Sequence, residues 1–276
     1  MNVKKIGDVL VTAHDQEKSK TIRLKKSLGQ NFLTSQSAVE RIVNLVGNEP
    51  SDCVEIGPGA GVMTQLLLKR GHKVHAFEID RRLEQPLKDR FRDYPGFRLY
   101  MGDYLKTSIP EELSEKCVSV VSNLPYHNGT AIIKKVLGDF SNIKTCVFMV
   151  QKEVALRMCS EAGHKSYGSL SIFMQYHFDI HMVFTLSPKH FNPPPKVDST
   201  VIRLFPRKEK PLGDNPESFF DFVRQGFMMR RKKLKNNYDF DIMVYASRIG
   251  LSDAVRAEEI SLQQWVRLYQ EVKRDG

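Results

Sequence analysis

Short apolar runs alternate with amphipathic stretches from about residue 51 onward, and this alternation limits the chain to few folds. The strand-like runs lie at 54–56, 73–80, 97–101, 117–121 and 145–150. Helix-like stretches at 62–68 and 81–94 separate the first three runs. Strands that alternate with helices are typical of βαβ units around a mostly parallel sheet. We therefore expect an α/β fold, with residues 200–205 as a late antiparallel edge strand.

The C-terminal part of the chain differs in composition from the part before it. After Pro206 the residues become more charged and helical. A chain of 276 residues has room for one large α/β domain and a small appendage. We expect a catalytic domain over 1–205 and a C-terminal helical domain over 206–276.

The charge of the chain favours a polyanionic partner, nucleic acid ahead of a membrane surface. The formal net charge is +10, with a pI near 9.4. Two basic clusters stand out: Arg224, Arg230, Arg231, Lys232, Lys233 and Lys235, and Lys18, Lys20, Arg23, Lys25 and Lys26. Such clusters bind the phosphates of a nucleic acid but do not recognise its base sequence. The alternative for each cluster is a solvated helix face, and we expect RNA binding because two of them occur together.

The cysteines and the N-terminus indicate a cytoplasmic protein. Residues 1–26 lack the apolar core of a signal peptide, and no apolar run is long enough to span a bilayer. The four cysteines lie in or beside apolar segments without CxxC spacing: Cys53, Cys117, Cys146 and Cys159. We expect buried free thiols, no metal site and, because no long apolar stripe is left over, a monomer.

A run of four residues after the fourth strand suits an exocyclic amino group on a flat ring. Asn123, Leu124, Pro125 and Tyr126 combine a carboxamide, a peptide carbonyl and an aromatic ring. The amino nitrogen of adenine is a poor nucleophile because its lone pair is delocalised. Two acceptors that hold its hydrogens favour a more tetrahedral nitrogen while the ring holds the base. Taken alone, the run also fits a strand followed by a proline turn.

Three earlier strand ends predict a nucleoside site. Gly57, Gly59 and Gly61 follow the first strand with G-x-G-x-G spacing, which lets the backbone approach a ligand. Glu78 ends the second strand, where a carboxylate accepts hydrogen bonds from ribose hydroxyls. Asp103 follows the third strand, where it can accept from an adenine amino group. The alternative for each carboxylate is a solvated strand end.

The ordered set of these motifs resembles the S-adenosylmethionine-dependent rRNA adenine N6-methyltransferases. It comprises residues 55–59, 77–80, 102–103 and 123–126. Residues 25–33 resemble the family's N-terminal motif, and residues 191–199 its loop on the substrate side of the pocket. The resemblance covers residues 23 to 235 and implies a Rossmann-like class I methyltransferase sheet. Residues 1–21 lack a clear match, and we expect them to be disordered.

Within that family, residues 29–33 and 230–236 resemble the bacterial branch that acts on the small ribosomal subunit. That branch adds two methyl groups to each of two adjacent adenosines in a hairpin loop near the 3′ end of 16S rRNA. The resemblance therefore implies a role in ribosome biogenesis. Three alternatives stay open: a large-subunit rRNA methyltransferase of the macrolide-resistance type, a methyltransferase of DNA or protein amides, and a non-catalytic RNA-binding assembly factor.

The resemblance also implies roles for individual residues. The residues expected to bind the cofactor are Asn31, Leu33, Gly57, Glu78, Asp103 and Asn123. Asn123, Pro125 and Tyr126 hold the target base, and Phe191 is expected as a second aromatic wall. The chain departs from the family at His127-Asn128-Gly129, where an Ile-Ser-Thr-Pro-like run is usual. We interpret His127 as a turn residue, because methyl transfer to this nitrogen requires no general base.

Overall fold

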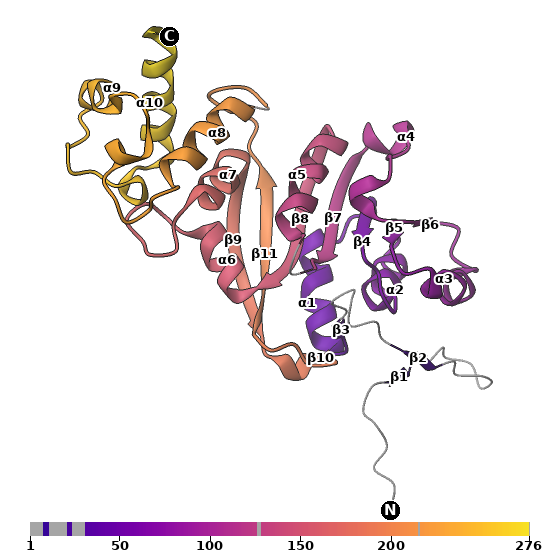
Figure 1. Cartoon of the computed structure of the whole chain (residues 1–276). Coiled ribbons are helices and arrows are strands. Elements are labelled where there is room, and N and C mark those ends of the chain that lie inside the picture. The colour runs from indigo at the N-terminus through magenta and orange to yellow at the C-terminus, as the bar shows by residue number, and fades with distance from the viewer. Residues whose placement is uncertain (1–7, 11–20, 24–30, 126–127, 215, 276) are drawn as a thin grey trace, which may run out of the picture. The chain divides into compact units, whose positions relative to one another are not determined.

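The computed structural model describes residues 8–10, 21–23, 31–125, 128–214 and 216–275 (Figure 1). The chain divides into two compact units. The first comprises Met1–Lys152 and Met182–Phe205, and the second Glu153–His181 and Pro206–Gly276. The second unit thus takes in a segment from the middle of the chain, which no change of composition indicated.

A seven-stranded sheet has the order β6-β5-β4-β7-β8-β11-β9 (Figure 1). Its strands are β4 (Asp52–Ile56), β5 (Lys73–Glu78), β6 (Phe97–Met101), β7 (Cys117–Asn123), β8 (Asn142–Gln151), β9 (Phe178–Leu186) and β11 (Ser199–Pro206). The pairs among β6, β5, β4, β7 and β8 are all parallel, whereas β11 pairs antiparallel with β8. Parallel strands end at the same edge of a sheet, so the segments after β4, β5, β6 and β7 are brought together.

The predicted edge strand is not at the edge. β11 lies between β8 and β9, so β9 is one edge strand of the sheet and β6 is the other. We did not expect a strand over 178–186, although its sequence, FDIHMVFTL, is mostly apolar. The run follows directly after the helical residues 169–177, and periodicity alone does not distinguish a short apolar strand from a buried helix segment.

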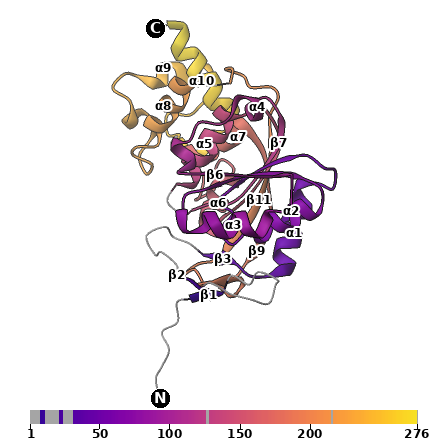
Figure 2. The same cartoon turned by 90° about the vertical axis from the view of Figure 1, so that its right-hand side faces the viewer.

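The helices of the first unit pack on neighbouring strands. They are α1 (Gln36–Val46), α2 (Val62–Lys69), α3 (Glu84–Phe91), α4 (Glu111–Ser114) and α5 (Gly129–Asp139), with short 3₁₀ turns η2 (Arg81–Leu83) and η3 (Tyr104–Lys106). α1 contacts α2, α2 contacts β5 and α3 contacts β6 (Figure 2). The core between these elements is built from apolar side chains such as Val43, Leu67 and Val74, none of which is exposed.

Two short strand pairs complete the described part of this unit. β3 (Phe32–Leu33) pairs antiparallel with β10 (Phe191–Asn192). β1 (Asp8–Leu10) pairs antiparallel with β2 (Thr21–Arg23). The expected disorder of residues 1–21 is therefore wrong for 8–10 and for 21, because their backbone groups pair as strands. Residues 1–7 and 11–20 lie outside the described residues.

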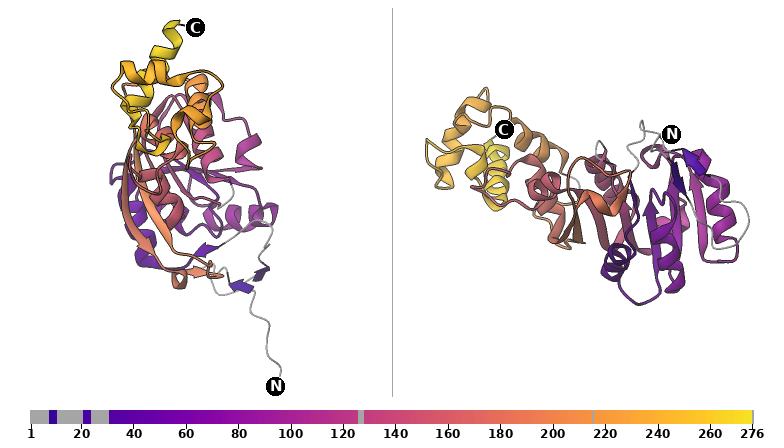
Figure 3. Two further views of the ribbon diagram at one scale, coloured as in Figure 1. Left: turned by 60° about the vertical axis from the view of Figure 1, so that its left-hand side comes forward. Right: turned by 90° about the horizontal axis from the view of Figure 1, so that it is seen from below.

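The second unit is mostly helical. It contains α6 (Lys152–Cys159) apart from its first residue, α7 (Ser169–His177), α8 (Glu217–Gly226), η5 (Leu234–Asn237), α9 (Ile242–Arg248), η6 (Ala257–Glu259) and α10 (Leu262–Asp275). The turn η4 (Pro188–His190) belongs to the first unit. α10 contacts α7, α8 and α9, and Figure 3 shows α8 to α10 (orange to yellow) gathered together. Trp265 is fully buried and packs against Phe222 and Phe227 in the core of this unit.

The cysteine prediction is only partly correct. All four thiols are free, and Cys53 and Cys146 are buried. Cys117 is exposed, because it begins β7 before the strand enters the core, and Cys159 is half-buried at the end of α6. Within the described part of the chain, no helix combines the length and apolar character needed to cross a membrane.

Candidate active site

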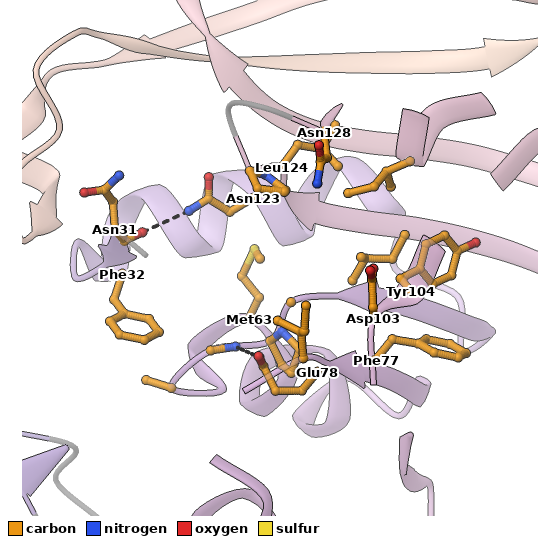
Figure 4. A pocket seen from close by; sticks show the side chains of 18 of the residues that line it. Asn31, Phe32, Met63, Phe77, Glu78, Asp103, Tyr104, Asn123, Leu124 and Asn128 are labelled. Carbon is orange, nitrogen blue, oxygen red and sulfur yellow. Dashed lines mark hydrogen bonds between the residues drawn. The ribbon is translucent and has the colours of Figure 1, made fainter. Parts of the chain in front are cut away.

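A pocket of about 330 Å³ lies at the carboxyl ends of β4 to β7 (Figure 4). Seven of the predicted site residues line it: Asn31, Leu33, Gly57, Glu78, Asp103, Asn123 and Pro125. Its volume falls within the range of small-molecule sites, and it lies where ligands bind in open α/β sheets. The fold thus brings residues from 31 to 125 of the chain into one cavity.

The glycine loop after β4 needs glycine for two different reasons. Gly57, Gly59 and Gly61 have φ angles of 72°, 56° and 77°, which side chains disfavour. A Cβ atom on Gly59 would lie 2.5 Å from the ring of Phe32. A Cβ atom on Gly57 would meet no atom within 4 Å, because it would project into open space. The space beside Gly59 is therefore occupied by the ring of Phe32, whereas the space beside Gly57 is open to a ligand.

Glu78 ties that loop to the end of β5. Its Oε2 accepts a hydrogen bond from the backbone N–H of Gly59 at 3.1 Å (Figure 4). Its Oε1 accepts from the N–H of Asp80 at 2.8 Å. Burial raises the pKa of the Glu78 carboxyl, and these two donors partly oppose the shift. Each carboxylate oxygen keeps a further lone pair, so ligand hydroxyls can still be held.

Asp103 begins the turn η3 after β6. Its Oδ1 accepts from the N–H of Leu105 at 3.0 Å, as an N-cap residue does. This bond fixes the carboxylate at the pocket wall beside Tyr104 (Figure 4). Tyr104 is itself held, because its hydroxyl donates to Asp139 at 2.7 Å.

Asn123, the last residue of β7, has a defined orientation. Its Nδ2 donates to the backbone carbonyl of Asn31 at 3.0 Å (Figure 4). The N–H of Leu124 donates to the carbonyl of Met149 at 3.0 Å, and the carbonyl of Pro125 accepts from the N–H of Asn128 at 3.3 Å. The strand end is thus anchored at successive residues. Tyr126, which we expect to stack on the base, and His127, which we interpret as a turn residue, lie outside the described residues.

Residues 31–34 are held over the pocket by a segment far along the chain. Leu33 pairs with Phe191, and the N–H of Thr34 donates to the carbonyl of His190 at 2.9 Å. Phe191 is buried in the core with Leu33 and is not among the lining residues that the structure describes. Its expected role as a second aromatic wall for the target base stays a prediction.

Glu55 is a buried carboxyl behind the glycine loop that we noted only as part of a motif. It is fully buried, and its Oε2 accepts from the hydroxyl of Thr64 at 2.6 Å. Its Oε1 has no hydrogen-bond partner within the described structure. Burial, with the charge of Glu78 nearby, raises the pKa of Glu55 to about 7.

We assigned no site role from the sequence to several other residues that line the pocket. They include Phe32, Met63, Phe77, Ile79, Leu105 and Asn128. Ile79 follows Glu78 and is 49% exposed, an apolar side chain left open at the pocket. Because Ile79 directly follows Glu78 at the end of β5, its place in the sequence could have indicated that it lies at the pocket. Across the described residues, no cluster of three or more His, Cys, Asp or Glu side chains could hold a metal ion.

Residues 21–274 match a single protein family, described as ribosomal RNA adenine dimethylase. The chain belongs to that family. It is therefore a methyltransferase that takes its methyl group from S-adenosylmethionine and acts on adenine in ribosomal RNA.

Relatives named "Ribosomal RNA small subunit methyltransferase A" support this membership. The relative from Sulfurihydrogenibium is 35% identical over 92% of this chain and 98% of its own length. The relative from Francisella tularensis subsp. novicida is 38% identical over 89% and 96%. Among solved structures, a dimethyladenosine transferase from Plasmodium falciparum has a TM-score of 0.76 at 24% identity, covering 89% of this chain and 98% of its own. The expected class I methyltransferase fold is confirmed.

Proposed function

We propose that the protein dimethylates the N6 amino groups of two adjacent adenosines in the 3′-terminal hairpin loop of 16S rRNA. The relatives named for the small subunit, aligned over nearly their whole length, support this substrate. The observation that carries the chemistry is the orientation of Asn123 in the same pocket as Glu78 and Asp103.

The pocket fits S-adenosylmethionine by the chemistry of its lining. Glu78 would accept hydrogen bonds from the ribose hydroxyls and Asp103 from the adenine amino group. The exposed side chain of Ile79 would cover an apolar ring face, and Gly57 would leave space for the amino-acid end. Asn31 and Leu33 would close the pocket from the side of β3. When bound, the cofactor supplies a methyl group activated by its sulfonium sulfur.

Asn123 and its neighbours would hold the target amino group. The bond from its Nδ2 to Asn31 leaves its Oδ1 to accept from the N6 hydrogens. The carbonyl of Pro125 has a second lone pair beyond the one used by Asn128, and it would supply the other acceptor. Asn123 and Pro125 would orient the N6 nitrogen to receive the methyl group, and the proton that N6 loses would pass to water. Catalysis in this scheme is mostly positioning. Stacking of Tyr126 on the base remains a prediction.

The second unit would supply affinity for RNA. Arg231, Lys232 and Lys233 are exposed and form no ion pair within the described part of the chain. Arg224 and Arg230 are instead paired with Asp221 and Glu258. We therefore assign phosphate binding to residues 231–233 and to Lys235, which is also exposed. The division into a catalytic domain over 1–205 and an RNA-binding domain over 206–276 stays part of this proposal.

The same function places the protein in the cytoplasm as a monomer that acts during ribosome biogenesis. Its partner would be 16S rRNA within the small ribosomal subunit. No membrane contact is part of the proposal.

The test is methyl transfer to defined ribosomal particles. Purified protein and radiolabelled S-adenosylmethionine are incubated with small subunits, large subunits or naked rRNA from a strain that lacks the modification. We expect labelled N6,N6-dimethyladenosine in small-subunit rRNA. Label in large-subunit rRNA would favour the macrolide-resistance type instead, and binding without transfer would favour an assembly factor.

A further inference from the structure

Asn128 occupies the N-cap position of α5 but does not cap the helix. Asparagine is a preferred N-cap residue because its side-chain oxygen accepts from an N–H of the first turn. Among the described residues, other N-cap side chains do so, including Ser35, Asp80, Asp103 and Asp241. Asn128 makes no such bond, and its φ and ψ of −117° and 5° are not the extended angles of a capping residue. Its carboxamide is thus directed elsewhere.

The carboxamide lies at the pocket while the backbone of Asn128 is fixed. Asn128 lines the pocket together with Asn123, Leu124 and Pro125 (Figure 4). Its N–H donates to the carbonyl of Pro125 at 3.3 Å, and its own carbonyl accepts from the N–H of Ile132 at 3.0 Å. Its side chain is exposed and forms no hydrogen bond with any residue that the structure describes. A held backbone with an uncommitted donor and acceptor is suited to a ligand.

The target base needs a donor that Asn123 does not provide. Asn123 directs an acceptor, Oδ1, to the amino group, because one of its N–H groups is bound to Asn31. In adenine the amino group is flanked by the ring nitrogens N1 and N7, and both accept hydrogen bonds. The Nδ2 of a second carboxamide matches either nitrogen, as asparagine does when it reads adenine in nucleic acids.

We propose that Asn128 is a substrate-binding residue whose Nδ2 donates to a ring nitrogen of the target adenine. The inference rests on the proposed function. Asn128 holds the ring and Asn123 holds the amino group, so base recognition is divided between the end of β7 and the start of α5.

The experiment compares Asn128→Ala, Asn128→Asp and wild-type protein on small subunits that lack the modification. We expect Asn128→Ala to lower kcat/KM about threefold to tenfold, the effect of one neutral hydrogen bond, mainly through KM. Asn128→Asp should lower it further, because a carboxylate has no donor and faces the ring nitrogen with an oxygen. The affinity for S-adenosylmethionine should not change. Asn142→Ala, an exposed asparagine outside the pocket lining, is the matched control.

A purely structural role predicts the opposite order. Aspartate caps helices as well as asparagine does, whereas alanine does not. If Asn128 only begins α5, Asn128→Asp would be as active and as stable as wild type, and that result would overturn the inference. Equal activity of Asn128→Ala and wild type would do the same.

Substrate analogues identify the atom concerned. When the target position carries 1-deazaadenosine or 7-deazaadenosine, the kcat/KM of wild-type protein should fall about threefold to tenfold for one of the two analogues. Asn128→Ala should show no further loss on that analogue, because the same bond is already missing. Additive losses on both analogues would overturn the inference. If wild type and Asn142→Ala also fail to methylate unmodified subunits, the proposed function itself fails, and the inference fails with it.

Discussion

The Nδ2 atom of Asn123 donates a hydrogen bond to the backbone carbonyl of Asn31, 92 residues earlier in the chain, at 3.0 Å. The bond fixes which end of the carboxamide faces the pocket. Because a side chain is held by a backbone group of another segment, the site is complete only when residues 31–33 are in place. The N-terminal motif therefore contributes to orienting the acceptor as well as to closing the pocket.

Asn123→Ala should nearly abolish methyl transfer while leaving cofactor binding largely intact. Loss of one preorganised polar group at a reacting centre lowers kcat about 10²-fold to 10³-fold. The cofactor touches many other lining residues, so its Kd should rise by less than about tenfold. Single-turnover transfer and calorimetric titration separate the two effects. Equal losses in both would argue that Asn123 serves only to hold the cofactor.

Gly57→Ala and Gly59→Ala form a matched pair, since both glycines have positive φ. Each variant should lose about 1 kcal/mol of stability from the left-handed backbone. Gly59→Ala should lose more, because its Cβ would lie 2.5 Å from the ring of Phe32. Gly57→Ala should instead weaken the binding of S-adenosylmethionine, as its methyl group projects into open space. Thermal unfolding and cofactor titration of both variants test this division. Identical stabilities would contradict it.

Glu78→Gln should weaken both the loop and the cofactor site. One carboxylate oxygen that now accepts from Gly59 or Asp80 would become an NH₂ group facing a backbone N–H. An unpaired buried donor costs about 1–3 kcal/mol of unfolding free energy. Cofactor affinity should fall at least about tenfold, because the ribose loses an ionised acceptor. Urea unfolding and titration measure the two effects, and Glu49→Gln, at an exposed position, is the control.

Glu55 should make the stability of the protein depend on pH. Its folded-state pKa is about 7, against an ordinary value of 4.5. Between these values the unfolded chain releases the proton that the native state keeps, so stability decreases as pH rises from about 4.5 to 7 and then levels off. Glu55→Gln removes this dependence. We expect the variant to gain up to about 3 kcal/mol over wild type at pH 8 and less than about 1 kcal/mol at pH 5.

Urea unfolding at both pH values checks this prediction. Glu78 also has a raised pKa, but it is present in both proteins, so the difference between them reports mainly on Glu55. A variant that is less stable than wild type at pH 8 would indicate that the Glu55 carboxyl has a further partner.

Replacing Arg231, Lys232 and Lys233 with glutamine should weaken RNA binding and reduce its salt dependence. Each lost phosphate contact should reduce the slope of log K against log salt by about 0.7–0.9. Cofactor affinity should not change. Arg224→Gln and Arg248→Gln serve as controls, because these arginines are paired with Asp221 and with Glu271 and Asp275. An unchanged slope in the triple variant would indicate that other residues bind the RNA phosphates.

Much of the fold could be predicted because its signals are local. The apolar runs of β4, β5, β7 and β8 follow from burial on both faces of a parallel sheet, and these strands and β6 were found within a few residues. β9 was missed because its mostly apolar sequence directly follows α7, and periodicity alone does not distinguish a short apolar strand from a buried helix segment. The N-terminal expectation was wrong at residues 8–10, since pairing of β1 with β2 depends on a segment elsewhere in the chain.

For the site, the sequence by itself determined the chemical groups, their order and the strand ends at which they stand. Parallel strands share one carboxyl edge, so Gly57, Glu78, Asp103 and Asn123 could be expected to converge. Only the tertiary structure decided what each group faces. It paired Phe191 with Leu33, bound Asn123 to the carbonyl of Asn31 and left the carboxamide of Asn128 at the pocket. Contacts between residues distant in the chain depend on backbone angles and packing, and residue spacing does not encode them.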